Sequence, residues 1–207
     1  MTYLFPNQVT RVIIPPEPEC IQTKRLLLMA IQPADAPGIF TIRSHPEVAK
    51  FLWQKEPESD IQQTEKWIAG KTFATPDGSG ALNRRFQFVI IRADDPAQRI
   101  IGTVGINSLI PAPSIGYALH PEFWGLGYST EAVQGVMNAW WQLPRVKPNG
   151  QLNGPGDGKE MLYACCNSEN AGSMKVLEKN GFRLYDKVAL EGHIVAYWRR
   201  GCETESH

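Results

Sequence analysis

Glycines and small hydroxyl residues between positions 124 and 130 are the part of the sequence best suited to chemistry. Gly125, Gly127 and Ser129 follow a short apolar stretch and precede residues with helical spacing. A turn of this kind aims several backbone N–H groups at one point, and the positive end of the helix dipole adds to them. The residues therefore predict an anion site, and phosphate is the usual anion at such a site.

Two common nucleotide-binding patterns fit this turn poorly. The P-loop needs a Lys followed by Ser or Thr after its last glycine, and no such pair follows Gly127. The dinucleotide fingerprint needs a third glycine, where this chain has Thr130, and an acidic residue about twenty positions later, where it has a loop at 148–151. An ordinary strand-to-helix turn with a capping Ser or Thr is the alternative that binds no ligand.

A strand and a helix must position this turn. Residues 115–119 alternate between bulky and small side chains, which predicts a strand with one thick and one thin face. Pro121 ends the strand, because proline has no N–H to give to a ladder. Apolar residues then recur at helical spacing over 132–140 and predict a helix packed on the core.

The other elements predict a mostly antiparallel sheet. Further strands are expected at residues 23–30, 86–92, 99–106 and 161–166, with a closing hairpin at 182–184 and 193–198. Further helices are expected within residues 33–53, with an interruption at His45-Pro46, and within residues 61–71 and 171–180. Short connections join the strands between residues 86 and 119, which favours an antiparallel meander over the parallel series of a dinucleotide-binding fold.

Composition excludes several classes of protein. The 207 residues are 43% hydrophobic and 20% charged, with zero formal net charge. This balance disfavours nucleic acid or an anionic membrane as the main partner, since proteins that bind them generally carry a basic patch. No apolar run approaches the ~20 residues of a membrane helix, and the N-terminus lacks a secretory pattern, so we expect a cytoplasmic protein.

Cysteine and proline usage add two expectations. Cys20, Cys165, Cys166 and Cys202 show no framework or zinc spacing, so we expect free thiols and no bound metal. Residues 1–22 contain several prolines and predict an extended arm before a single domain at 23–207. Residues 143–159 carry four glycines and three prolines and predict a surface loop excursion.

The order of these elements resembles the GNAT superfamily of acyl-CoA-dependent N-acetyltransferases over about residues 23–200. Two motifs carry the resemblance. Residues 115–132 are similar to the branch that includes the ribosomal-protein-alanine N-acetyltransferases, and residues 170–182 resemble that branch's Asn-x-x-Ser and Lys-x-Gly-Phe motif. The resemblance implies an α/β (α+β) fold with a mixed, mostly antiparallel sheet of about six to seven strands flanked by about four helices.

The resemblance also implies a reaction and a binding site. The reaction would be direct transfer of an acetyl group from acetyl-CoA to a primary amine, without a metal. The residues that it assigns to acetyl-CoA are Tyr117, Ala118, Leu119, Trp124, Gly125, Leu126, Gly127, Tyr128, Ser129, Thr130, Asn170 and Ser173. Trp124 and Ser129 depart from the family's usual residues, but the donors of this site belong to the backbone.

Catalytic roles follow from the same motifs. The resemblance assigns oxyanion binding to the backbone N–H of Leu119 and assigns Asn170 to the pantetheine amide, although Asn170 also suits a helix N-cap. Leu177 stands where many members carry a catalytic Tyr, so Ser173 is the predicted acid for the leaving thiolate. Three side chains near the predicted cleft are candidates for the base: His120, Glu122 and Glu131. The alternative is that water alone takes the proton.

Cys165 and Cys166 raise the possibility of a covalent acyl-Cys route, but no His stands at a fixed spacing to activate them, so a structural role is favoured.

The acceptor is predicted less closely. A peptide N-terminus or a small amine would enter between residues 40–68 and the hairpin at 185–193, where the side chains predicted to line the pocket are Phe51, Leu52, Trp53 and Trp67. The zero net charge favours neither a strongly acidic nor a strongly basic acceptor, and we expect a monomer or homodimer. Two alternatives stay open: a module of the same fold that binds CoA without catalysis, and a nucleotide-dependent oxidoreductase.

Overall fold

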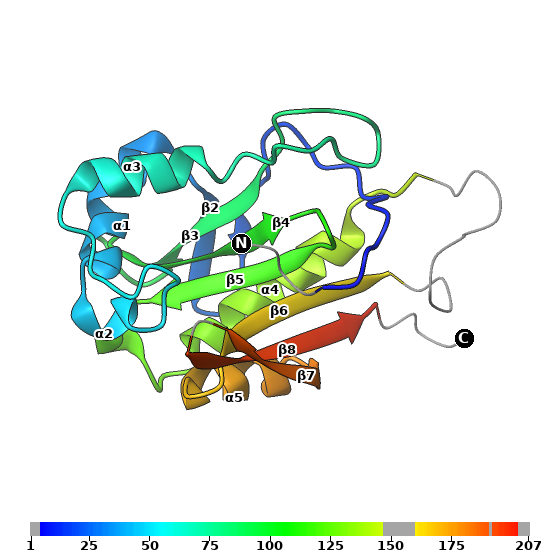
Figure 1. The fold of residues 1–207 in the computed structure, drawn as a ribbon. Helices are drawn as coiled ribbons and strands as arrows, with labels where there is room; N and C mark the ends of the chain where they lie inside the picture. Colours follow the sequence, from blue (N-terminus) through cyan, green and yellow to red (C-terminus); the bar gives the residue numbers. More distant parts are fainter. Residues whose placement is uncertain (1–4, 147–159, 191, 203–207) are drawn as a thin grey trace.

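The described residues, 5–146, 160–190 and 192–202 of a computed structural model, form one eight-stranded sheet (Figure 1). The strand order is β1-β2-β3-β4-β5-β6-β8-β7. The strands are β1 (Ile21–Gln22), β2 (Leu26–Ala30), β3 (Phe86–Arg92), β4 (Ile100–Ser108), β5 (Ser114–Leu119), β6 (Met161–Asn167), β7 (Arg183–Leu190) and β8 (His193–Gly201). Only the β5–β6 pair is parallel among these strands, so the mixed, mostly antiparallel sheet is confirmed.

Five α-helices flank the sheet in the described part of the chain. They are α1 (Ala36–Arg43), α2 (Pro46–Ala49), α3 (Ile61–Ala69), α4 (Tyr128–Gln142) and α5 (Ala171–Lys179). The strand and helix numbers each exceed the expectation by one. A short edge strand, β1, pairs with β2. The predicted interruption at His45 and Pro46 is confirmed, because the extended backbone of His45 separates α1 from α2.

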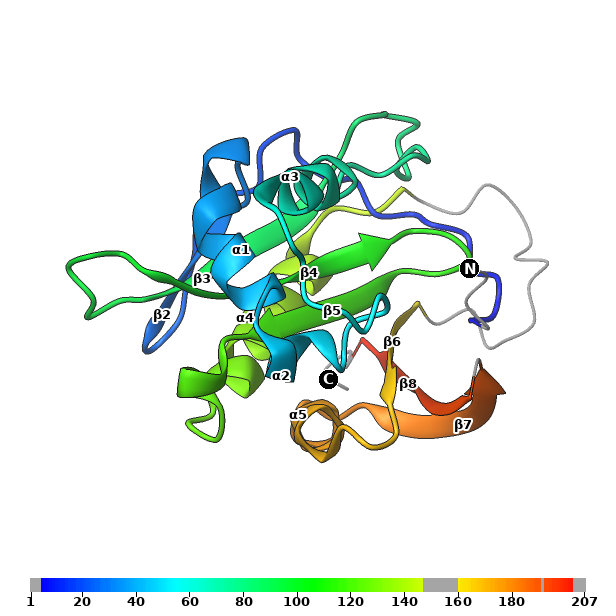
Figure 2. The same ribbon diagram turned by 60° about the vertical axis from the view of Figure 1, so that its left-hand side comes forward.

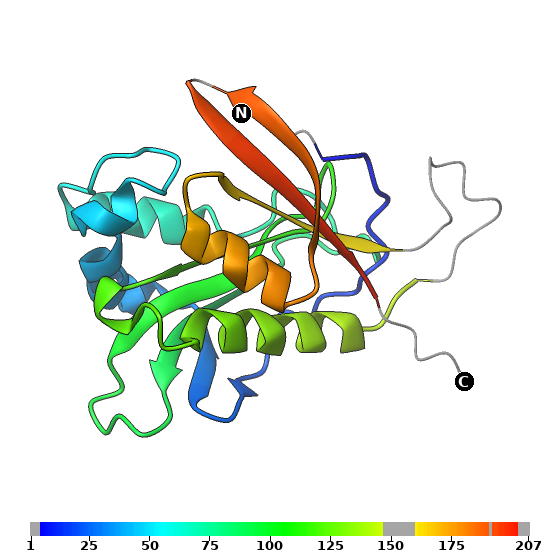
Figure 3. The ribbon, with the colours of Figure 1, turned by 90° about the horizontal axis from the view of Figure 1, so that it is seen from below.

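The helices cover both faces of the sheet (Figures 2 and 3). On one face, α4 buries Val133, Val136 and Trp140 against Phe88 and Val104 of the central strands. On the other face, α1 and α3 pack against β3 in a smaller cluster. The alternation predicted for β5 matches this arrangement of helices. The bulky residues of β5 pack in the core beneath α4, and its small residues face the other side of the sheet.

The parallel strands β5 and β6 meet at one end only. Their paired residues are Ser114 and Tyr163, and the N–H of Tyr163 donates to the carbonyl of Pro113 at 2.9 Å. Toward their C-terminal ends the two strands diverge, and α4 begins at the same end (Figure 1). An opening in the sheet therefore lies beside the glycine turn.

The N-terminal arm contributes to the core as far as it is described. Val12 and Ile14 are fully buried, and the N–H of Ile14 donates to Asp77 Oδ2 at 2.9 Å. The arm passes so close to Gly78 that a Cβ there would lie 2.3 Å from the backbone of Arg11. Most of the predicted loop excursion, residues 147–159, lies outside the described residues. None of the described helices is long and apolar enough to cross a membrane.

Candidate functional site

A cavity of about 900 Å³ runs along β5 from the glycine turn to helices α1, α2 and α3, which lie on the sheet face opposite α4. Its wall includes all of β5, the start of α4, the start of α5 and the segment around α2. The cavity thus brings together the two motifs of the sequence, which are separated by most of α4 and by β6.

The glycine turn needs its glycines for backbone geometry. Gly125 has φ 75° and Gly127 has φ 81°, a left-handed conformation that L side chains rarely adopt. Gly127 is also the N-cap of α4, so no side chain caps the first N–H groups of that 15-residue helix. The first N–H groups of a helix have no partner within the helix, and here Tyr128, Ser129 and Thr130 line the cavity. The turn can therefore offer backbone donors to an anion.

The predicted cofactor residues converge on this cavity with one exception. Those that line it are Tyr117, Ala118, Leu119, Trp124, Gly125, Gly127, Tyr128, Ser129, Thr130, Asn170 and Ser173. Leu126 is not among the lining residues; its side chain is exposed, and its carbonyl accepts a hydrogen bond from Arg25 Nη1 at 3.0 Å.

Glu131 holds the glycine turn against β2. Its Oε1 accepts from Thr23 Oγ1 and from the Arg25 N–H, each at 2.7 Å, and its Oε2 pairs with Arg25 Nε at 2.7 Å. The guanidinium of Arg25 also lies 4.5 Å from the Tyr128 ring centroid. Burial opposes ionisation, but the hydrogen bonds from Thr23 and Arg25 outweigh it and lower the pKa of Glu131. The side chain does not line the cavity.

The ladder between β4 and β5 sets the direction of the Leu119 N–H. The His120 N–H donates to the carbonyl of Ile101 at 2.9 Å. Successive residues of an antiparallel strand direct their N–H groups to opposite sides, so Leu119 directs its N–H toward the β5–β6 opening. Trp124 Nε1 donates to the Leu119 carbonyl at 2.7 Å and fixes this end of the strand to the turn.

The start of α5 forms the opposite wall of the opening. Asn170 is the N-cap of α5, and its Oδ1 accepts from the Ser173 N–H at 2.9 Å. The hydroxyl of Tyr117 donates to the Ser173 carbonyl at 3.0 Å, which joins β5 to α5. Burial raises the pKa of Tyr117 well above its usual range. Leu177 is buried in the core, at the position where a catalytic Tyr was sought.

The two cysteines of β6 line the cavity as protonated thiols. Burial raises the pKa of Cys165 to about 12 and that of Cys166 to about 11. A thiol is nucleophilic only as the thiolate, so neither side chain is activated for covalent catalysis at neutral pH.

The other two base candidates lie near the end of β5. Neither His120 nor Glu122 is among the residues that line the cavity. Burial lowers the pKa of His120, whose ring lies 5.2 Å from that of His45. Glu122 is exposed and pairs with Arg99 at 3.0 Å. Among the described residues, no group of three or more His, Cys, Asp or Glu side chains could hold a metal.

The thin face of β5 forms the floor of the other half of the cavity. Gly116 pairs with Gly105 of β4, and the Asn107 amide lies directly over Gly116, since a Cβ there would be 2.0 Å from Asn107 Nδ2. The Asn107 Oδ1 in turn accepts from Lys71 Nζ at 2.8 Å. Lys71 follows α3 and lines the cavity. Burial and the nearby Arg43 lower the pKa of Lys71 to about 7.

A buried ion pair lies beside Lys71. Arg43 Nε pairs with Glu58 Oε1 at 2.5 Å, and Thr64 donates a short hydrogen bond to the other carboxylate oxygen. The guanidinium of Arg43 lies 4.4 Å from the Trp67 ring centroid and the ammonium of Lys71 lies 4.3 Å from it. The sequence did not predict Arg43 or Lys71 as residues of the site. The small residues on one face of β5 were the one feature of the sequence that indicated space for a ligand in this region.

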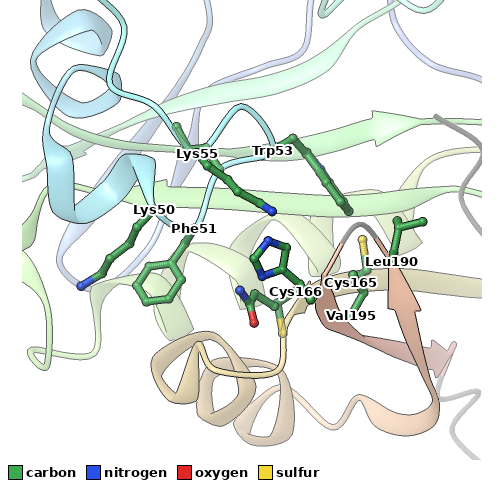
Figure 4. Close-up of a pocket in the computed structure, with 11 residues that line it drawn as sticks. Lys50, Phe51, Trp53, Lys55, Cys165, Cys166, Leu190 and Val195 are labelled. Atoms are coloured by element: carbon green, nitrogen blue, oxygen red, sulfur yellow. The ribbon is translucent and has the colours of Figure 1, made fainter.

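The segment after α2 forms the mouth of the cavity. The four residues predicted to line an acceptor pocket, Phe51, Leu52, Trp53 and Trp67, all border this cavity. A second, smaller pocket shares Trp53 with it, and Figure 4 shows this pocket with Trp53 and Lys55 on one side and Leu190 and Val195 on the other. The segment and hairpin predicted to form the acceptor pocket therefore face each other here.

Comparison with known proteins places this chain among acetyltransferases. The family profile of the acetyltransferase (GNAT) domain matches residues 25–183. The chain is 31% identical over 166 residues to an uncharacterized N-acetyltransferase, YoaA, of Bacillus subtilis (strain 168), covering 79% of this chain and 82% of that protein. It is 29% identical over 123 residues to an uncharacterized N-acetyltransferase, p20, of Bacillus licheniformis, covering 58% of this chain and 65% of p20, slightly under two thirds of its length.

Solved structures share the fold at lower identity. RimL, a ribosomal L7/L12 alpha-N-protein acetyltransferase solved in complex with coenzyme A, matches with a TM-score of 0.63 and 20% identity, covering 88% of this chain and 98% of that chain.

Proposed function

The chain belongs to the GNAT acetyltransferase family, and we propose that it transfers an acetyl group from acetyl-CoA directly to a primary amine. One observation carries the proposal: the glycine turn, the β5–β6 opening and the start of α5 all border one cavity. The RimL structure concerns an enzyme that acts on a protein N-terminus, so we include peptide N-termini among the acceptors, beside small amines.

The residues of the turn fit the pyrophosphate of this cosubstrate. Backbone N–H groups between Gly125 and Thr130 would bind the phosphates, and the two glycines leave room for close approach. Lys175 and Lys179 of α5 line the same cavity and add positive charge. No metal is needed, because N–H dipoles balance the phosphate charge. Asn170 would bind the pantetheine arm through its amide N–H₂, since its Oδ1 already serves as the N-cap.

The reacting groups would meet in the opening between β5 and β6. When bound, acetyl-CoA supplies a thioester, a carbonyl that an amine can attack. The Leu119 N–H would donate to the carbonyl oxygen as it gains negative charge, a contribution often worth about 3 kcal/mol. Ser173 would donate to the departing thiolate. A free thiol has a pKa near ~8.5, so this leaving group needs only weak assistance.

The residues favour direct transfer and a simple proton path. Cys165 and Cys166 stay protonated at neutral pH, which disfavours an acyl-cysteine. Glu131 and Glu122 are held in other contacts. We therefore propose that water carries the proton away from the amine, with His120 as the remaining side-chain candidate.

Thiol release tests this function. The protein, acetyl-CoA and a panel of amines are incubated together, and free CoA is measured with a thiol reagent while calorimetry reports acetyl-CoA binding. We expect binding and amine-dependent release. Absence of binding would refute the proposal.

The buried Leu177 favours one other candidate, a module that binds CoA without catalysis. Binding without release for every amine, unchanged in Ser173→Ala, would identify such a module.

A further inference from the structure

We propose that the molecule that supplies the acceptor amine also carries a carboxylate, which Lys71 binds. This inference rests on the proposed acetyl transfer and names the class of acceptor. It concerns the half of the cavity that lies over the thin face of β5, which we call the acceptor half; Lys71, Gln87, Asn107 and Gly116 border it.

The charge of the cavity wall favours an anionic ligand. Among the described residues that line it there is no Asp or Glu. The cationic lining residues are Arg43, Lys50, Lys71, Lys175 and Lys179. Lys175 and Lys179 belong to α5, beside the glycine turn, and are available to the phosphates of CoA. Arg43 and Lys71 come from the opposite side and belong to the acceptor half.

Lys71 is the cation of this half that has no carboxylate partner in the described part of the chain. Arg43 is paired with the buried Glu58, so those two charges cancel locally. The described contacts of Lys71 are the neutral Asn107 and the Trp67 ring. A carboxylate on the ligand would supply the missing counter-charge, and it would favour the protonated form of an ammonium whose pKa is lowered to about 7.

Gln87 gives a second, independent indication of a ligand. Its side chain is 1% exposed and borders the cavity, yet its Oε1 has no hydrogen-bond partner among the described residues. A buried carbonyl oxygen without a donor is costly, and such atoms are nearly always paired in native proteins. A further N–H or O–H of the acceptor molecule, other than the reacting amine, would satisfy it.

The sheet register places these two groups on one floor. Gln87, Gly105 and Gly116 form a row across three adjacent strands, so they face the same side. Asn107, which binds Lys71, lies over Gly116. An acceptor with its carboxylate on Lys71 and a further N–H or O–H on Gln87 can therefore contact both groups while its amine extends along β5 toward Leu119. A free amino acid, or an N-terminal residue with an acidic side chain, has this chemistry.

Matched acceptors test the proposal. One arm compares free amino acids with their amides, and the other compares C-terminally amidated dipeptides that differ only by Glu or Gln. We expect kcat/KM to be about tenfold or more higher for the carboxylate member in at least one arm, as for the loss of one charge-assisted hydrogen bond. The arm that shows the preference identifies the source of the carboxylate. Equal values in both arms would overturn the proposal.

Glutarate tests the same site without turnover. We expect this dicarboxylate to bind the wild-type protein in calorimetry, and to bind Lys71→Met about tenfold more weakly. Glutarate binding without transfer to any amine would contradict the proposed reaction and leave the carboxylate site standing. Failure to bind glutarate would overturn the site, whether or not CoA is released in the amine assay.

Three variants separate the role of Lys71 from other roles. Lys71→Met should remove the preference for carboxylate acceptors. The variant protein should bind CoA with unchanged affinity, which also shows that its fold is intact. Lys71→Arg should retain the preference, because a guanidinium also binds carboxylate. Lys66→Met, on the exposed side of α3, should behave as wild type. If Lys71→Arg loses transfer to charged and neutral amines alike, Lys71 acts as the proton acceptor and the proposal is wrong.

Discussion

The Tyr117 hydroxyl donates a hydrogen bond to the Ser173 backbone carbonyl at 3.0 Å, and this contact joins β5 to α5 across the opening in the sheet. Both residues line the cavity. Since β5 and β6 pair only at their other end in the described structure, this hydrogen bond is one of the contacts that set the width of the opening.

Removal of this hydroxyl should loosen the start of α5. Tyr117→Phe leaves the Ser173 carbonyl without this donor, at a cost of about 1 kcal/mol. We expect CoA affinity to fall about fivefold in calorimetry, the same free energy expressed as a ratio. Tyr163→Phe, whose ring belongs to the cluster with Phe5 and Tyr197 outside this cavity, serves as the control. An unchanged affinity in Tyr117→Phe would show that the contact does not shape the site.

A side chain at Gly127 should weaken CoA binding more than it weakens the fold. A Cβ there would approach Arg25 Nη2 to 3.4 Å, so there is space for it within the protein, but the left-handed backbone is strained by any L residue. We expect Gly127→Ala to lose tenfold or more in CoA affinity, because a Cβ occupies the approach to the N–H donors.

Gly80→Ala is the matched control, because Gly80 has φ 85° and open space around it. Both variants should lose stability of about 1–2 kcal/mol from backbone strain alone. CoA affinity that falls equally in both, or in neither, would contradict the placement of the site at the turn.

Glu131 should act as a support of the turn and not as the base. Glu131→Ala removes the acceptor for Thr23 and Arg25, so we expect CoA affinity to fall while kcat at saturating acetyl-CoA is retained. A large loss of kcat under saturation would instead assign the base to Glu131.

The same contacts predict a pH dependence of stability. The pKa of Glu131 is lowered in the folded protein, so its contribution to stability is present above the ordinary glutamate range and is lost as the pH falls through the lowered value. Denaturant unfolding between pH 3 and pH 6 should show a smaller decline for Glu131→Ala than for the wild-type protein. Parallel curves would rule out this linkage.

Ser173 should contribute to kcat and little to binding. Its side-chain hydroxyl is separate from the backbone N–H that Asn170 caps, so Ser173→Ala keeps the helix start. We expect kcat to fall about 10- to 100-fold with CoA affinity unchanged, at or below the low end of general-acid contributions, because a thiolate needs only weak assistance to leave. Ser168→Ala, in the preceding turn, is the control. A fully active Ser173→Ala variant would show that the thiolate leaves without an acid at Ser173.

The cysteines of β6 should be slow to react. With pKa values of about 12 for Cys165 and about 11 for Cys166, alkylation at pH 7.5 should modify the exposed Cys20 and Cys202 first. Mass spectrometry after short exposure to iodoacetamide measures the order. An acetyl group trapped on Cys165 or Cys166 during turnover would contradict direct transfer.

Local chemistry made the glycine turn, the Asn170 cap and the alternation of β5 predictable. Each depends on residues within a few positions: a left-handed glycine before a helix, an amide oxygen three residues before the N–H that it accepts from, and a two-residue period. The patterns along the chain also predicted the order of the elements, which carried the resemblance to the family and which the sheet confirms.

The tertiary structure decided which distant residues meet. Glu131 contacts Thr23 and Arg25, more than a hundred positions earlier, through the packing of α4 against β2. Lys71 reaches Asn107 across 36 positions, and Gln87 faces the cavity through the register of β3 with β4. These relationships arise from sheet register and helix packing, which sum many long-range contacts. A single sequence therefore identified the end of the cavity that we propose to bind phosphate, and the fold alone assembled the end that we propose to bind the acceptor.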